Sequence, residues 1–182
     1  MFISARCRFV APLLLVVLVG LVGLGGPRPR SLAQDATPPA SPAIGSVGIT
    51  GVVLGGIAPI AAPGYSLEMF HMEWAPGAYV AAHTHPMAFV TCVESGALGF
   101  TIQAGAATVA RAAVPGESEQ LEVDVEAVLG PRDCVVVDNE AIRTIHTARN
   151  ADPGTTVAWE ADLSKLGEPA TIFVDDMGMP IP

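Results

Sequence analysis

The chain has 182 residues, and its nine basic and eighteen acidic side chains give a formal net charge of −9 at neutral pH. This negative charge disfavours nucleic acid and anionic lipid as partners, because both carry the same sign. The sequence contains no Gly-x-Ser-x-Gly elbow, phosphate-binding loop or dinucleotide fingerprint. It therefore does not resemble the enzyme classes that those motifs mark.

The N-terminal segment has the pattern of a secretory leader. Arg6 and Arg8 precede an apolar run over residues 9–26, and Ser31-Leu32-Ala33 has the small-x-small form of a cleavage site. We therefore predict a signal peptide over 1–33 and a secreted or otherwise extracytoplasmic protein. Cleavage would leave 149 residues, one domain's length, with five basic and all eighteen acidic side chains.

The alternative is an uncleaved leader that anchors the chain in a membrane. The apolar run is close to the roughly 20 residues that a transmembrane helix needs. A membrane is therefore a partner only if the leader stays in place.

Residues 34–48 are rich in Pro, Ala and Ser, which predicts a flexible linker. From residue 49 to residue 182 short β-type runs alternate with Gly- and Pro-containing turns. This spacing predicts an all-β, antiparallel sandwich or barrel. The expected strands are 49–55, 66–74, 78–85, 87–94, 97–104, 107–113, 119–129, 133–138, 143–149, 155–163 and 170–174.

The clearest alternation lies at residues 121–126. Leu121, Val123 and Val125 alternate with three acidic residues, which predicts a half-buried strand with an acidic outer face. Calcium binding by that face is the less favoured interpretation, because a solvated strand face is much commoner.

Histidines carry the main functional signal. His83 and His85 are two positions apart in a predicted strand, so their side chains should share one face. Pro86 follows directly. A third histidine, His146, lies farther along the chain, with Asn150 four residues after it.

These segments resemble the two motifs of the cupin superfamily. Gly77, His83, His85 and Gly96 fall on the first motif with the right spacing, and the second motif ends in the His-x-x-x-Asn pattern of IHTARN. The resemblance covers residues 66–162. It implies a double-stranded β-helix, or jelly-roll, barrel, with the histidines meeting inside its mouth. It also implies a homodimer, since small cupins often pair.

The chain departs from the family pattern at Phe89, which stands where the family has a glutamate ligand, and at Ala141 and Arg143 in the second motif. The resemblance therefore implies a mononuclear site of three histidines, His83, His85 and His146. One divalent transition metal ion (Fe, Zn, Cu, Ni or Mn) would bind there with open positions for a small-molecule ligand.

Two functions follow from this site. One is an oxygenase or isomerase-like enzyme acting on a small organic acid or phenol; the other is a binding module that sequesters a small ligand. The position where an acid–base group is expected holds Phe89, so no catalytic residue is assigned. A decayed barrel without metal is the alternative to both.

The remaining histidine, methionine and cysteine side chains are less favoured as metal ligands. His71 is expected to be a packed or surface residue, because the inward face of its strand, 66–74, is not determined. Met69, Met72 and Met87 are expected to fill the core. Cys92 and Cys134 lie on strands that would be neighbours in the barrel, but in a rough register they do not face each other. We therefore expect both to be reduced. No cysteine has a histidine close behind it, which argues against a blue-copper site.

Overall fold

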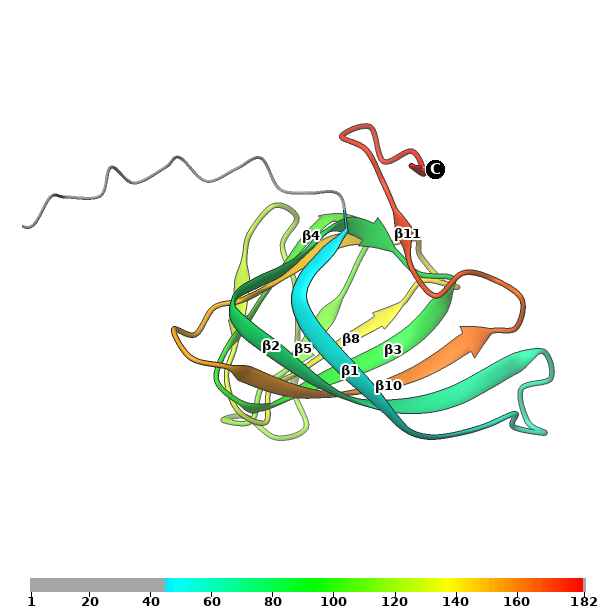
Figure 1. Ribbon diagram of the computed structural model, residues 1–182, viewed down its shortest axis with the longest axis horizontal. Coiled ribbons are helices and arrows are strands. Elements are labelled where there is room, and N and C mark those ends of the chain that lie inside the picture. Colours follow the sequence, from blue (N-terminus) through cyan, green and yellow to red (C-terminus); the bar gives the residue numbers. More distant parts are fainter. Residues whose placement is uncertain (1–44, 182) are drawn as a thin grey trace, which may run out of the picture. The chain divides into compact units, whose positions relative to one another are not determined.

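The computed structural model describes residues 45–181, and no α-helix occurs within them (Figure 1). The described chain is an all-β fold. Its strands are β1 (Ser46–Ile57), β2 (Tyr65–Thr84), β3 (Met87–Ser95), β4 (Leu98–Ala104), β5 (Thr108–Ala110), β6 (Ser118–Gln120), β7 (Ala127–Leu129), β8 (Cys134–Asp138), β9 (Ile145–Asn150), β10 (Thr156–Lys165) and β11 (Ile172–Phe173).

The strands form one antiparallel sheet in the order β6-β5-β8-β3-β10-β2-β9-β4-β7, and β1 and β11 also pair with β2. The sheet curls into a barrel, and the long strand β2 pairs with strands on both sides of it (Figure 1). The first half of β2 pairs with β10, and the second half pairs with β9. This is the cupin-like jelly-roll arrangement that the sequence resemblance implied.

Alternation along each strand directs one set of side chains inward. In β3, Met87, Phe89, Thr91 and Val93 are buried, whereas Val90 is exposed. The buried side chains pack together in one core inside the barrel. Its members are Trp74, Ala78, Met87, Phe89, Val93, Leu98, Phe100, Ile102, Ala107, Val109, Leu129, Val135, Val137 and Ala148.

The two glycines of the first motif have backbone reasons to be glycine. Gly77 lies within β2 at φ 76°, and Gly96 lies in the turn after β3 at φ 79°. Side chains other than glycine rarely adopt this left-handed region. A Cβ on Gly96 would also lie 2.8 Å from the Cα atom of Thr156.

Two expectations about strands are wrong. The predicted strands 66–74 and 78–85 are one continuous strand, β2. The predicted strand 119–129 is broken into β6 and β7, because Asp124 adopts φ 61° and its N–H donates to the carbonyl of Ile102. Of its apolar residues, Leu121 packs against the core, but Val123 and Val125 are exposed.

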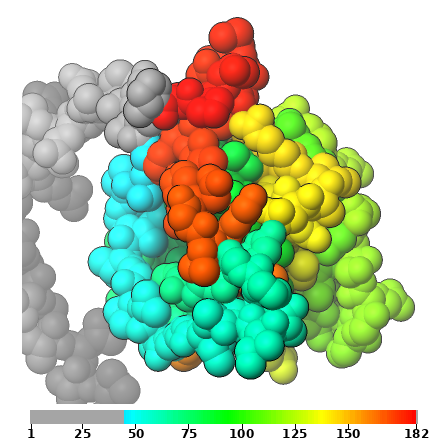
Figure 2. Space-filling view, turned by 90° about the vertical axis from the view of Figure 1, so that its right-hand side faces the viewer, coloured from blue at the N-terminus to red at the C-terminus, as the bar shows by residue number. Residues whose placement is uncertain are grey.

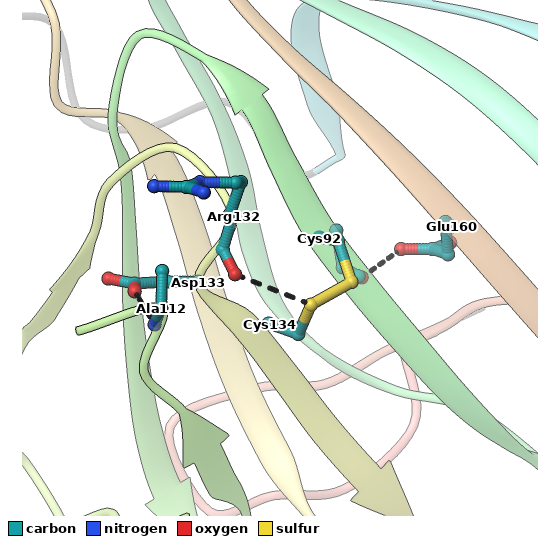
Figure 3. The surroundings of a disulfide bond; sticks show 7 residues. Cys92, Ala112, Arg132, Asp133, Cys134 and Glu160 are labelled. Carbon is teal, nitrogen blue, oxygen red and sulfur yellow. Dashed lines mark hydrogen bonds between the residues drawn. A yellow bond between two sulfur atoms is a disulfide. The ribbon is translucent and has the colours of Figure 1, made fainter. Parts of the chain in front are cut away.

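The expectation that Cys92 and Cys134 are reduced is also wrong. They are direct partners in the β3–β8 register, their Cα atoms are 4.1 Å apart, and their sulfurs form a disulfide. Figure 3 shows this bond between the two strands. The bond lies next to Asp133, whose carboxylate accepts hydrogen bonds from the N–H of Ala112 and from Arg111.

The domain boundary differs slightly from the expected one. Strand β1 begins at Ser46, so residues 46–48 belong to the sheet and not to the linker. The predicted signal peptide over 1–33 and most of the predicted linker lie outside the described residues. Within residues 45–181 there is no helix with the length and hydrophobicity needed to span a membrane.

Candidate metal centre

His83 lies at the end of β2, where the strand changes its register, and His85 directly follows the last residue of the strand, Thr84. The pairing of β2 with β9 shifts between Val80 and His83, and all three of Val80, His83 and His85 line the same cavity. The shift is a local bulge that moves the inward face from even to odd positions. The ring centroids of the two histidines are 4.6 Å apart, so the prediction that they share one face is confirmed.

His146 joins this pair from β9. Its Cα is the cross-strand partner of His83, and its ring centroid lies 4.1 Å from that of His83 and 5.2 Å from that of His85. One ligand atom from each histidine lies within 4.8 Å of the others. The three histidines singled out in the sequence therefore form one cluster.

Backbone carbonyls orient two of the rings. Nδ1 of His83 donates to the carbonyl of Ala81 at 2.6 Å, and Nδ1 of His85 donates to the carbonyl of Ala170 at 2.7 Å. A carbonyl only accepts, so each Nδ1 carries the proton and each Nε2 keeps a free lone pair. Metal-binding histidines are usually oriented in this way.

Packing orients the third ring. His146 stacks on Phe100 with ring centroids 4.6 Å apart and an angle of 22° between the planes. Its Nδ1 is buried and makes no hydrogen bond of ordinary geometry with any described residue, although the backbone of Thr144 lies close enough to raise the pKa of the ring.

Burial keeps all three rings neutral. It lowers the pKa of His83 to about 4, and together with the neighbouring His83 it lowers the pKa of His85 to about 3. Burial also places the pKa of His146 well below its usual value. Neutral imidazoles at physiological pH are the form that binds metals.

The cluster fits a transition metal ion. Nitrogens bound at about 2.1 Å to one tetrahedral ion are about 3.4 Å apart, so side-chain rotations that move the ligand atoms by up to roughly 1.4 Å would bring them into range. Phe89 is buried, and its ring centroid lies 5.2 Å from that of His85 and 5.6 Å from that of His146. The phenyl ring thus fills the space beside the cluster where a carboxylate ligand was expected.

A cavity of about 200 Å³ opens beside the histidines. Most of its wall is apolar, but it also contains Thr91 and Glu160, two polar residues that sequence reasoning missed. The cavity therefore contains a carboxyl group, that of Glu160, although position 89 supplies none. The remaining residues that line it are Ser46, Ile49, Met72, Trp74, Val80, Phe89, Leu98, Phe100, Ala148, Thr171 and Phe173.

The weaker candidates lie elsewhere. His71 is on the outer face, where its Nε2 lies 3.5 Å from a carboxylate oxygen of Glu94 and its ring meets the edge of Trp159. Met69 is exposed, and the sulfur of the buried Met87 accepts a hydrogen bond from Ser164. Of the three methionines considered, only Met72 lines the cavity.

Asn150 has a structural role in this arrangement. Its side-chain amide donates to the carbonyls of Trp74, Ala75 and Gly154 at 2.9, 3.0 and 2.7 Å. These bonds tie the end of β9 to the bend in β2. The second-motif asparagine therefore holds the strands that carry the histidines and does not itself enter the cluster.

The C-terminal segment covers the histidine end of the cavity. β11 pairs with β2 at His83 and Thr84, and Phe173 lies 5.9 Å from His83 between ring centroids. In Figure 2 the orange segment after β10 lies between the cyan atoms of β1 and the yellow atoms of the chain near residue 140. This segment also supplies the Ala170 carbonyl that orients His85.

No family model matches the chain, and no curated protein matches it. Solved structures similar to it include a cupin 2 domain-containing protein from Halorhodospira halophila, at 17% identity over 72% of this chain and 73% of that one, with a TM-score of 0.48. KdgF from Halomonas sp. is 18% identical over 65% of this chain and 82% of that one, with a TM-score of 0.41. A cupin superfamily protein from Desulfitobacterium hafniense is 14% identical over 64% and 78%, with a TM-score of 0.42.

Proposed function

We propose that the chain is an exported protein that binds one divalent transition metal ion through His83, His85 and His146 and holds a small organic anion beside it. The observation that carries this proposal is the convergence of three neutral imidazoles within 4.8 Å. Two of them are oriented by backbone carbonyls.

The chemistry of the cavity favours an anionic ligand. Three imidazoles add no negative charge, so a bound ion keeps its full charge and attracts a carboxylate or another oxygen donor. When bound, the metal would polarise that ligand as a Lewis acid. The apolar wall, with Ile49, Trp74 and Leu98, excludes water and accommodates a short hydrocarbon portion.

Metal analysis of matched variants tests the proposal. The wild-type protein, reconstituted with Zn²⁺ or Fe²⁺ and desalted, should retain one ion per chain. His83→Ala and His85→Ala should lose it, whereas the control His71→Ala should retain it because His71 lies on the outer face. Wild-type protein without metal after reconstitution with Fe²⁺, Zn²⁺, Cu²⁺, Ni²⁺ and Mn²⁺ would contradict the proposal.

The second candidate is a barrel that binds a small apolar ligand without metal. Phe89 favours it, because the phenyl ring occupies the usual ligand position and extends the apolar wall. Calorimetry with phenol as the probe separates the two candidates. Unchanged binding to His83→Ala would favour the metal-free barrel.

Two observations support export. The first 33 residues have the leader pattern described above, and the disulfide between Cys92 and Cys134 is typical of proteins in oxidising compartments. The intact mass of the extracytoplasmic protein should correspond to a chain that begins at or near Gln34. A chain that still begins at Met1 and sediments with membranes would instead indicate an anchor.

A further inference from the structure

Two acidic residues of β10 point toward the barrel interior. Glu160 and Asp162 are two positions apart, so they share the inward face of the strand with the buried Thr156 and Ala158. Glu160 lines the cavity together with the three histidines. Asp162 is only 5% exposed, and its Cα is the β3 partner of Phe89. The carboxyl group missing at position 89 thus has a counterpart on the adjacent strand.

The contacts of this pair leave it short of hydrogen-bond donors. The hydroxyl of Thr91 donates to Oε2 of Glu160 at 2.5 Å. Oδ1 of Asp162 is buried and has no hydrogen-bond partner among the described residues. No Lys, Arg or His in residues 45–181 forms an ion pair with either carboxyl group. The charged residue that faces Asp162 from β2 is Glu68, another acid.

Two ionised carboxylates are unfavourable when they are buried side by side without a cation. Burial and, to a smaller extent, the negative charges of Glu160 and Glu68 together raise the pKa of Asp162 to about 8. Burial also raises the pKa of Glu160, while the bond from Thr91 lowers it. A single proton held between the two carboxyl groups removes one charge and gives the pair the donor that it lacks.

We propose that Glu160 and Asp162 hold one proton between them and that Glu160 exchanges this proton with a small 2-oxo acid bound in the cavity. This proposal rests on the proposed function, because the histidine-bound metal would hold the carboxylate and oxo oxygens of that acid. Glu160 is then the catalytic acid–base residue, and Asp162 is a positioning residue that acts through it.

The step needs no further reactant. With the shared proton on Asp162, the free carboxylate of Glu160 accepts a second proton from C3 of the 2-oxo acid, and the electron pair of the broken C–H bond stays on the substrate as an enolate. Return of the proton to C3 restores the acid, and its return to oxygen gives the enol. Nothing is oxidised or reduced. The 2-oxo acid class fits because it combines two oxygen donors for the cation, an acidic C–H group and a short chain for the apolar wall.

Infrared spectroscopy of the metal-free protein tests the shared proton without reference to activity. At pH 7 the wild-type protein should show the C=O band of one buried protonated carboxyl group. The double variant Glu160→Gln/Asp162→Asn should lack this band, whereas Glu122→Gln, a control at an exposed acid, should keep it. A band that persists in the double variant, or wild-type protein without it, overturns the pair.

Hydrogen exchange tests the proton transfer. In D₂O the zinc-loaded protein should exchange the C3 hydrogens of 2-oxobutyrate, as followed by proton NMR. Glu160→Gln should slow this exchange at least about 100-fold, while zinc content and the Kd of 2-oxobutyrate change less than about threefold. Asp162→Asn should shift the pH profile of exchange toward lower pH, which a purely structural role would not do.

The outcomes separate the two proposals. Wild-type protein that binds zinc and 2-oxobutyrate without accelerating exchange, or Glu160→Gln that exchanges as fast as wild type, overturns the acid–base role and leaves the metal site intact. Failure of the wild type to bind zinc overturns the proposed function and the proton transfer with it. The infrared result then still decides whether the carboxyl pair holds a proton.

Discussion

The barrel interior contains two polar regions, the histidine cluster and the carboxyl pair, whose pKa values burial shifts in opposite directions. The pKa values of His83 and His85 are lowered to about 4 and 3, whereas that of Asp162 is raised to about 8. Burial opposes charge in both regions. The histidines become neutral by releasing a proton, which frees a lone pair, and the carboxyl groups by retaining one. The same apolar surroundings thus produce an electron-pair donor in one region and a proton donor in the other.

The largest expected effect is the acid sensitivity of the metal-free protein. The folded protein keeps its three histidines neutral below pH 6.5, whereas the unfolded chain takes up protons there. The free energy of unfolding should therefore fall as the pH is lowered from 6.5, by up to about 1.4 kcal/mol per pH unit for each proton. The carboxyl pair offsets about one of the three protons, so the net slope is at most roughly 3 kcal/mol per unit.

Urea unfolding at successive pH values measures this slope. His71→Ala is the control, because this histidine lies on the outer face, and its slope should match that of the wild type. A flat profile between pH 6.5 and 5 would show that the cluster is not kept neutral by burial. Metal binding should correspondingly persist to about pH 4, and not weaken near pH 6 as ordinary histidines would require.

Phe89→Glu joins the two regions by placing a carboxyl group between them. In the metal-free protein it should cost about 3 kcal/mol or more, because the phenyl ring is lost and a third acid is buried opposite Asp162. Saturating Mn²⁺ should recover part of this loss, since a carboxylate is the hard ligand that the site lacks. Urea unfolding with and without Mn²⁺ measures both effects.

Phe89→Leu is the matched control for that variant. It reduces the ring volume without adding a carboxylate, so it should cost less and gain no affinity for Mn²⁺. Equal Mn²⁺ binding by both variants would show that position 89 does not face the metal.

A smaller effect isolates the carboxyl pair. Between about pH 7.5 and 8 the histidines are nearly all neutral in both states, but the folded pair retains a proton that the unfolded carboxyl groups have lost. The free energy of unfolding should therefore fall as the pH rises through this window, by at most about 1.4 kcal/mol per unit. Asp162→Asn should flatten the fall, and Asp124→Asn, at an exposed turn, should preserve it. Identical slopes in the two variants would count against a shared proton.

Thr91→Val gives the smallest expected change. It removes the hydroxyl that donates to Glu160 and should cost about 1 kcal/mol. Because that bond favours the ionised form, its loss should also move the alkaline fall in stability to higher pH. Thr101→Val, at a hydroxyl without a described partner, should change stability by less than about 0.5 kcal/mol. Similar effects of both substitutions would mean that the bond to Glu160 contributes little.

The histidine cluster could be predicted because two local patterns identify it. His83 and His85 follow the two-residue period of a strand, and the His-x-x-x-Asn segment gives the third ligand. The two side chains line the same cavity although β2 ends at Thr84, between them. The all-β fold followed similarly from short alternating runs and turn residues.

The carboxyl pair could not be found in this way, because the hydrophobic pattern of its strand predicts the wrong inward face. Trp159, Ala161 and Leu163 form the more apolar face of β10, so alternation places Glu160 and Asp162 in solvent. The structure directs the acids inward and leaves Trp159 38% exposed. The face of β10 that lines the cavity thus reverses the ordinary pattern, which only the neighbouring strands of the fold reveal.

The disulfide was missed because cross-strand register depends on features that the sequence does not localise. Turn lengths and bulges decide which residues of two strands face each other. Cys92 and Cys134 are 42 positions apart, and the intervening strands had uncertain ends, including the one that Asp124 interrupts. A register error of one or two residues was enough to separate the cysteines.

The bond between Cys92 and Cys134 makes the segment between them a covalent ring. This ring contains the whole of β4, whose Phe100 supports His146, and also the exposed turn at residues 113–117. A protease that cuts in this turn would open the ring but would not divide the molecule. Both ends would stay tied through the two sulfurs, so a nicked protein would run as one band until it is reduced.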